Sequence, residues 1–290
     1  MTAQNLSELL NVNGLNVNGE YHTFNREERH YAALLFHFLL NRKWLRKFLD
    51  LINDKSKKFP GSIHHDFDPA NIRIFFEYAH ARDLWFAAKK ESSLSSEKLN
   101  EKLRLVILSL LKDPPESLGL SKKSVHDFND FFGAKSTDQI QMPGRWSKLK
   151  FSEWVDLGGR DFAKRACTLI WAFNAKADLV IHTGNNRAIC IEAKVDSAES
   201  KYRAADFESS QTLIQEYVLN ELLGFKTTFV VLSKNGKVGI RSKLPDEKSI
   251  GLCWKDVFGL MDLTEIDPIE ELPFVHESVM SNVIAKPKDK

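Results

Sequence analysis

A β-hairpin in the second half of the chain limits the possible folds more than any other segment. The runs 177–183 and 187–195 are rich in apolar and β-branched residues, and the Gly-Asn-Asn sequence at 184–186 between them is a turn former. Alternate positions of both runs are apolar: Leu179, Ile181, Ile189, Ile191, Ala193 and Val195. A slip of one residue would bury the charged positions instead, so the pattern predicts both the register and a sheet with one face on a core.

The opposite face of this hairpin carries the charged residues. With the turn centred on Asn185, Asp178 lies directly opposite Glu192, so two carboxylates meet on one face. Lys194 lies two positions beyond Glu192 and points the same way, because side chains alternate along a strand. Burying such charges without partners is costly. A divalent cation between Asp178 and Glu192 would relieve the cost, and Mg²⁺ suits carboxylates combined with water and phosphate.

The residues Asp178 and Glu192-Ala193-Lys194 resemble the signature of the PD-(D/E)xK nuclease superfamily, which has an acid on one strand and an acid-x-Lys triplet on the next. Ala177 stands where that family often has proline. The resemblance covers roughly residues 150–262 and implies a restriction-endonuclease-like core of helix, hairpin, helix and strand. Helical spacing over 160–173 and 206–223, with Gly224 after the second, and the apolar run 227–232 predict these elements in that order.

The resemblance also implies a mechanism and its residues. Asp178, Glu192 and the backbone carbonyl of Ala193 would hold Mg²⁺, with Mn²⁺ as a substitute, against a scissile phosphate. Lys194 would orient or deprotonate the attacking water and offset the charge of the transition state. Asp161, on the helix before the hairpin, and Gln211, on the helix after it, are the expected supporting residues. Gln215 lies one turn from Gln211.

The fold class expected is α/β, with a mainly helical N-terminal region, 1–149, followed by a nuclease-like domain with a C-terminal tail, 150–290. Helices are predicted over 25–51, 71–88, 95–112 and 124–132, and a linker over 139–150. The N-terminal region would supply recognition or a partner surface.

Several other residues have both a possible functional role and a simpler structural one. Glu28 and its neighbour Glu27 could join a metal site, but acids at a solvated helix N-terminus are the preferred interpretation. His64 and His65 are expected on a surface loop, because adjacent histidines point apart and no third ligand is suitably spaced. Trp146, between basic residues, is the one tryptophan considered for stacking on a base.

The net charge of the chain is too small to create a strong positive potential over the whole protein. The formal charge is +2 over 290 residues, so a local basic patch must attract DNA if DNA is the substrate. The longest apolar run, 31–40, is too short to span a bilayer, and the first residues lack the features of a signal peptide. We therefore expect a cytoplasmic protein with reduced cysteines and no membrane partner. A homodimer remains open.

The hypothesis favoured by the sequence is a Mg²⁺-dependent deoxyribonuclease acting in restriction, repair or phage defence. Two alternatives remain. One is a catalytically idle nuclease-like module that binds DNA or a protein. The other is an unrelated α/β domain in which the charges of Asp178, Glu192 and Lys194 form a structural ion pair. Metal-dependent cleavage would separate the first hypothesis from both.

Overall fold

The centre of the molecule is a five-stranded mixed sheet. The computed structural model describes residues 28–58, 62–90, 93–112, 114–195, 200–236 and 249–260. The strand order is β1-β2-β3-β6-β7, formed by β1 (Arg73–Tyr78), β2 (Ala177–His182), β3 (Arg187–Ala193), β6 (Lys226–Ser233) and β7 (Ser249–Cys253). β2 pairs antiparallel with both β1 and β3, whereas β6 and β7 run parallel to β3. The predicted α/β class is confirmed, and β3 is the middle strand in this order.

The hairpin has the predicted register. Leu179 pairs with Ile191 and Ile181 with Ile189, which places Asp178 level with Glu192 at the next position. The turn closes with a hydrogen bond from the Arg187 N–H to the Gly184 carbonyl at 2.9 Å. All three turn residues, 184–186, have positive φ, a conformation that Gly and Asn adopt more readily than other residues.

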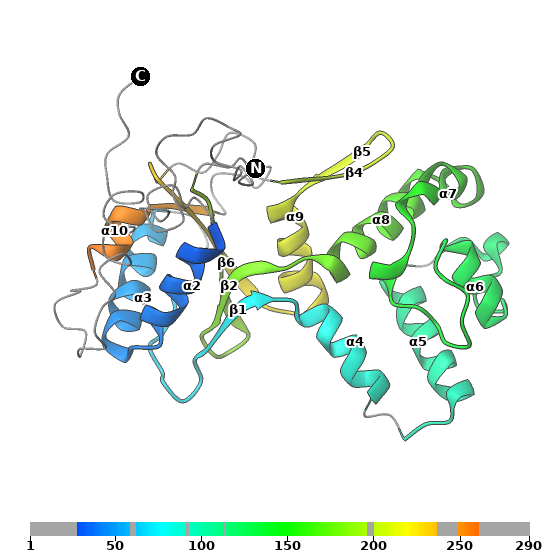
Figure 1. Ribbon diagram of the computed structural model, residues 1–290, viewed down its shortest axis with the longest axis horizontal. Coiled ribbons are helices and arrows are strands. Elements are labelled where there is room, and N and C mark those ends of the chain that lie inside the picture. The colour runs from blue at the N-terminus through cyan, green and yellow to red at the C-terminus, as the bar shows by residue number, and fades with distance from the viewer. Residues whose placement is uncertain are drawn as a thin grey trace, which may run out of the picture.

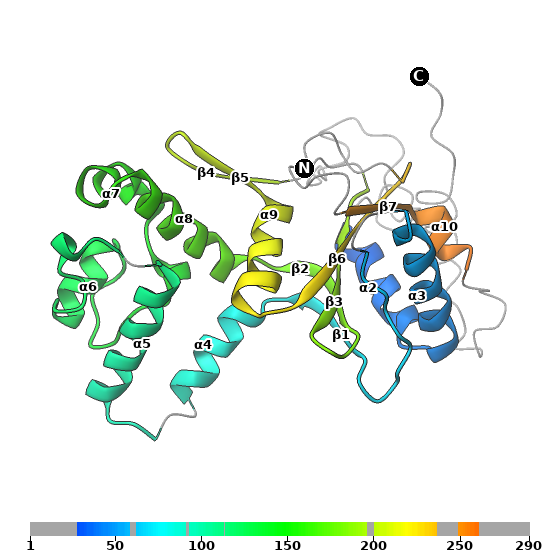
Figure 2. The same ribbon diagram turned by 180° about the vertical axis from the view of Figure 1, so that it is seen from behind.

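The two faces of the sheet pack against different helices. The apolar face predicted for the hairpin contacts α2 (Glu28–Leu39) and α3 (Arg42–Ser56) in one buried cluster, which also includes Trp254 of α10 (Trp254–Phe258). The opposite face, with Val180 and Cys190, packs on Leu219 of the π-helical segment η5 (Tyr217–Leu222), which continues α9 (Gln211–Glu216). Figures 1 and 2 show α2 and α3 on one side of the sheet and α9 on the other.

A helical arm extends from the sheet on the side away from α3 (Figures 1 and 2). It comprises five α-helices and three short 3₁₀ turns: α4 (His80–Lys90), α5 (Ser96–Leu110), η2 (Glu116–Leu118), α6 (Val125–Phe131), η3 (Pro143–Arg145), η4 (Lys148–Lys150), α7 (Phe151–Gly158) and α8 (Arg160–Asn174). The helices predicted over 95–112, 124–132 and 160–173 are confirmed as α5, α6 and α8. Ser95 and Ser124 cap the first two with their side chains.

Three predicted helices are corrected. The segment 71–88 contains β1 before α4, because its aromatic residues alternate between the two faces of the sheet and β1 pairs with β2. The helix predicted over 25–51 is divided at Asn41, whose side chain caps α3 by accepting from the Lys43 and Trp44 N–H groups; its residues before 28 lie outside the described residues. The segment 206–223 begins with β5 (Phe207–Ser210), which pairs with β4 (Lys201–Ala204), and becomes helical only from α9.

The sheet combines residues from both sides of the expected boundary at 149/150. β1 lies in the same sheet as β2, and Phe48 and Leu49 of α3 belong to the same buried cluster as Ile191 of β3. The first helices of the chain are therefore part of the sheet's core, whereas residues 80–174 form most of the helical arm. In the described part of the chain, no helix has both the length and the apolar character required to cross a bilayer.

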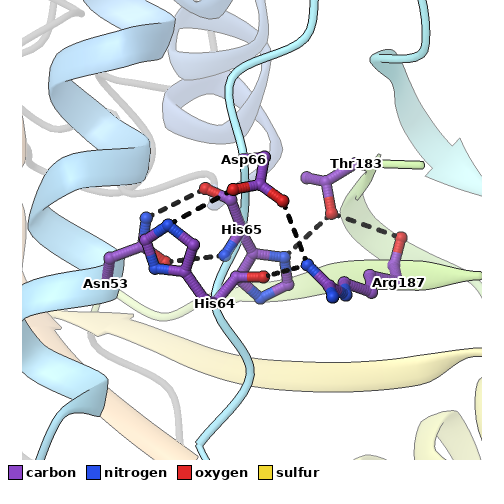
Figure 3. A network of polar contacts seen from close by, with 6 residues as sticks. All are labelled: Asn53, His64, His65, Asp66, Thr183 and Arg187. Carbon is purple, nitrogen blue, oxygen red and sulfur yellow. Dashed lines mark hydrogen bonds and ion pairs between the residues drawn. The ribbon is translucent and has the colours of Figure 1, made fainter. Parts of the chain in front are cut away.

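A buried polar network ties the hairpin to the segment that follows α3 (Figure 3). His65 is only 1% exposed, and its ring nitrogens lie 2.9 Å from Thr183 Oγ1 and 2.8 Å from Thr228 Oγ1. Asn53 holds the His65 backbone through its N–H and carbonyl, both at 2.9 Å. Arg187 donates to the His64 carbonyl at 2.8 Å. The expectation of a surface loop therefore fails for His65, whose side chain is part of the core.

Candidate active site

Asp178 and Glu192 are held side by side on neighbouring strands. Asp178 Oδ2 accepts a 2.8 Å hydrogen bond from the Ala193 N–H, which fixes the carboxylate against β3. Glu192 lies opposite Asp178 in the register of β2 and β3, and it is only 3% exposed. The carbonyl of Ala193 points to the same edge of β3 as its N–H, because both groups of one residue project together in a strand. The structure thus brings Asp178, Glu192 and Ala193 together.

Both oxygens of Glu192 have fixed partners. Lys194 Nζ donates to Oε1 at 2.6 Å, and Gln215 Nε2 donates to Oε2 at 2.7 Å. Gln215 is buried on α9, and its own oxygen lies 3.7 Å from the Cys190 thiol. Gln215, which follows Gln211 by one turn, therefore makes the contact with the acid itself.

Burial and crowding dominate the electrostatics of the site. Burial, followed by the neighbouring Asp178 carboxylate, raises the pKa of Glu192 to about 7, although Lys194 and Gln215 act in the opposite direction. Burial also raises the pKa of Asp178, against the opposing hydrogen bond from Ala193. Burial tends to lower the pKa of Lys194, but Glu192, Glu28 and Asp178 together raise it above its ordinary value. The site therefore combines two acids that are costly to ionise with a stabilised ammonium.

A small polar pocket of about 200 Å³ opens above these residues. Gln211 lines it, and the Gln211 N–H donates to the Ser200 carbonyl at 3.1 Å. Gln211 Oε1 is buried and has no hydrogen-bond partner among the described residues, so this oxygen could accept from a water or a ligand, or bind a cation. The lining residues are Glu28, Arg29, Glu77, Lys176, Ala177, Asp178, Glu192, Lys194, Ser200 and Gln211.

Glu28 belongs to this pocket, contrary to the preferred interpretation of a solvated helix end. Its Oε1 accepts from the Val195 N–H at 3.1 Å, and its Oε2 lies 3.6 Å from Lys194 Nζ. The sequence signal that could have identified it is an acid at the start of the first helix, which the helix dipole explains equally well. Glu27 lies outside the described residues.

The mouth of the pocket is lined by an ion-pair chain that the sequence did not reveal. Glu77 lies 3.5 Å from Arg29 Nε and 3.3 Å from Lys176 Nζ. Glu77 lies between the paired residues Phe76 and Tyr78 of β1, level with Asp178, and at its φ of 50° it has no partner in the register with β2. Two cations are thereby held next to the acids.

Two other candidates lie elsewhere. Asp161 is exposed in the first turn of α8 and is not among the described residues that line the pocket. Trp146 is 5% exposed and stacks on Phe132 with ring centroids 3.8 Å apart, so its faces are not open to a base. Its place is in the core of the helical arm.

The residues fit a hard divalent cation. Two crowded carboxylates with raised pKa values and an unpartnered amide oxygen in one polar pocket are a donor set of oxygens only. In the described ranges, no three His, Cys, Asp or Glu side chains are grouped as a complete metal site. A cation here would take further ligands from the Ala193 carbonyl, water and substrate, as Mg²⁺ commonly does.

Comparison with known proteins gives no match: no family model, no curated protein and no solved structure is similar to this chain. The functional argument therefore depends on the site itself.

Proposed function

We propose that this protein is a Mg²⁺-dependent nuclease that hydrolyses phosphodiester bonds of DNA. The observation that carries the proposal is the buried arrangement of Asp178, Glu192 and Lys194 in one polar pocket, with every oxygen of Glu192 oriented by a donor. A structural ion pair would need one acid for one lysine. Here Asp178 and Glu28 also lie near the Glu192–Lys194 pair, and a bound cation would relieve the repulsion between Asp178 and Glu192.

The division of roles follows from the contacts. Asp178, Glu192 and the Ala193 carbonyl would hold the cation, with Gln215 fixing the orientation of Glu192. When bound, Mg²⁺ would polarise a phosphoryl oxygen and lower the pKa of a water molecule. Lys194, kept as an ammonium by its acidic neighbours, orients the attacking water and offsets the negative charge that grows on the phosphate. By the resemblance, the products would carry a 5′-phosphate and a 3′-hydroxyl.

Cleavage of plasmid and single-stranded DNA by purified protein tests the proposal. We expect cleavage with Mg²⁺ or Mn²⁺, none with EDTA, and binding of Ca²⁺ without turnover. Asp178→Ala and Glu192→Ala should each abolish cleavage and keep the fold, since each removes a charge that crowds the pocket. Asp156→Ala, an exposed acid on α7, is the matched control. Full activity in EDTA would refute the metal mechanism, and an inactive wild type under all ions would favour the binding module.

A further inference from the structure

Helix α3 has a strongly basic face on the opposite side from its buried stripe. Its first two turns carry Arg42, Lys43, Arg46 and Lys47, at positions that recur every four residues and so lie on one side of the helix. The other side is buried against the sheet through Trp44, Leu45, Phe48, Leu49 and Ile52. The position of the cationic face is therefore fixed by the packing of the core.

This basic face lines a groove of about 590 Å³, together with Asp50, Phe67 and Pro69. We call it the α3 groove. The guanidinium carbon of Arg46 lies 4.2 Å from the centre of the Phe67 ring, which is a cation–π contact. Lys47 Nζ donates to the Leu260 carbonyl at 3.2 Å. Neither Arg42 nor Arg46 forms an ion pair with a carboxylate in the described ranges.

The charge of the α3 groove comes from side chains and not from the end of the helix. The Asn41 side chain already accepts from the Lys43 and Trp44 N–H groups at 2.9 and 3.4 Å. The described lining of the groove carries four cations and one acid, Asp50, in a protein whose whole formal charge is only +2. This is the local basic patch that an otherwise balanced protein needs in order to attract a polyanion.

The α3 groove is separate from the active-site pocket but connected to it by α2. Glu28, the first residue of α2, lines the pocket, and α3 begins three positions after α2 ends at Leu39. The 12 residues of α2 span about 18 Å at about 1.5 Å per residue.

We propose that the α3 groove binds the phosphate backbone of DNA outside the active-site pocket. The identity of the polyanion rests on the proposed function, whereas the location of the surface rests on the groove itself. Arg42 and Arg46 contact phosphates, and Phe67 keeps Arg46 oriented before DNA arrives. Such contacts position the duplex and carry no sequence information.

The test measures binding without cleavage, in an Asp178→Ala background, by fluorescence anisotropy of a labelled duplex of about 20 base pairs across salt concentrations. Arg42→Gln/Arg46→Gln should weaken binding about tenfold or more and reduce the salt slope by about two, one for each phosphate that is no longer neutralised. A second variant, Arg42→Gln/Lys43→Gln, leaves the Arg46–Phe67 contact intact. Weaker binding by this variant therefore cannot result from the loss of that contact. Lys55→Gln/Lys122→Gln removes the same charge from exposed sites outside the groove and should change neither quantity.

The outcomes separate this proposal from the nuclease proposal. If wild-type protein never cleaves DNA but binding depends on the α3 groove, the groove assignment stands and the nuclease assignment falls. If wild-type protein cleaves and both groove variants bind like the control, the groove assignment falls alone. Tight binding of poly-glutamate or of duplex RNA with no binding of DNA would also overturn it, because the occupant would then be another class of polymer.

Discussion

Glu28 and Lys194 lie 3.6 Å apart, oxygen to nitrogen, although Glu28 opens the first described helix and Lys194 follows the central strand. Glu28 also accepts from the Val195 N–H across 167 positions of sequence. The carboxylate thus fixes both the side chain of Lys194 and the backbone immediately after it. Glu28 is a positioning residue for the ammonium, in addition to Glu192.

Glu28→Gln should therefore reduce cleavage without unfolding the protein. The amide oxygen can still accept from the Val195 N–H, but the negative charge beside Lys194 is lost. We expect the rate at saturating Mg²⁺ to fall about tenfold, as for a group that assists through another residue. Glu28→Ala, which also removes the acceptor for the Val195 N–H, should in addition lower the free energy of unfolding by about 1–2 kcal/mol. Glu97→Gln, in the exposed first turn of α5, is the control, and equal rates for all three variants would remove Glu28 from the site.

Lys194→Ala should separate cation binding from chemistry. The two acids remain, so calorimetric Mg²⁺ or Ca²⁺ binding persists or tightens, while single-turnover cleavage falls by about 10²–10³. Lys194→Arg should restore little, because the guanidinium fork does not fit the space between Glu192 and Glu28. A lysine mutant that cleaves at the wild-type rate would return the hairpin to a structural ion pair.

Gln215→Leu tests whether the orientation of Glu192 is needed. Leucine fills a similar space but leaves Glu192 Oε2 without its 2.7 Å donor in a buried position. We expect weaker Mg²⁺ binding and a loss of about 1–3 kcal/mol in the free energy of unfolding. Gln215→Glu should weaken folding in metal-free buffer more than Gln215→Leu, because it adds a third acid. Unchanged Mg²⁺ affinity in both would show that the carboxylate needs no such support.

The stability of the fold should fall in mild acid because of His65. Burial, followed by the charges of Arg187 and His64, lowers its pKa from 6.5 to about 4. Between these values the unfolded chain binds a proton that the folded protein excludes, so stability is full above pH 6.5 and is lost as the pH falls towards 4. The loss attributable to His65 is about 3 kcal/mol.

Urea unfolding at several pH values, in wild type and His65→Gln, measures this dependence. The variant should be less stable at neutral pH and should lose less stability on acidification. It retains some dependence, because burial also lowers the pKa of His182 to about 4. Parallel curves for wild type and variant would contradict the assignment to His65.

The hairpin was predictable because its information is local. Alternation over 177–195 determined the strand register and the two faces, and the structure confirms both. Gly224, with φ of 72°, ends the following helix as predicted. The site residues Asp178, Glu192, Lys194 and Gln211 could be proposed from the same segment and its neighbouring helix, and the structure brings them to one pocket.

The remaining features depend on contacts distant in sequence. Glu28 joins the site only because α2 packs on β3, which no local periodicity encodes. β1 was predicted as helix because its aromatic residues satisfy helical spacing as well as alternation, and its pairing with β2 determines the outcome. Asp161 was predicted because the family resemblance implies a supporting acid on the helix before the hairpin, but Asp161 lies in the first turn of α8, a helix of 15 residues whose other end leads to the hairpin.

The position of β3 at the centre of the sheet has a consequence for hydrogen exchange. The Lys194 N–H donates to the Leu232 carbonyl at 2.7 Å, and the Ala193 N–H donates to Asp178. Both amides are therefore hydrogen-bonded within the central part of the sheet, and we expect them to exchange slowly. We therefore expect the strand that carries Glu192 to belong to the last cooperative unit to unfold, so that partial unfolding affects the helical arm before it affects the pocket.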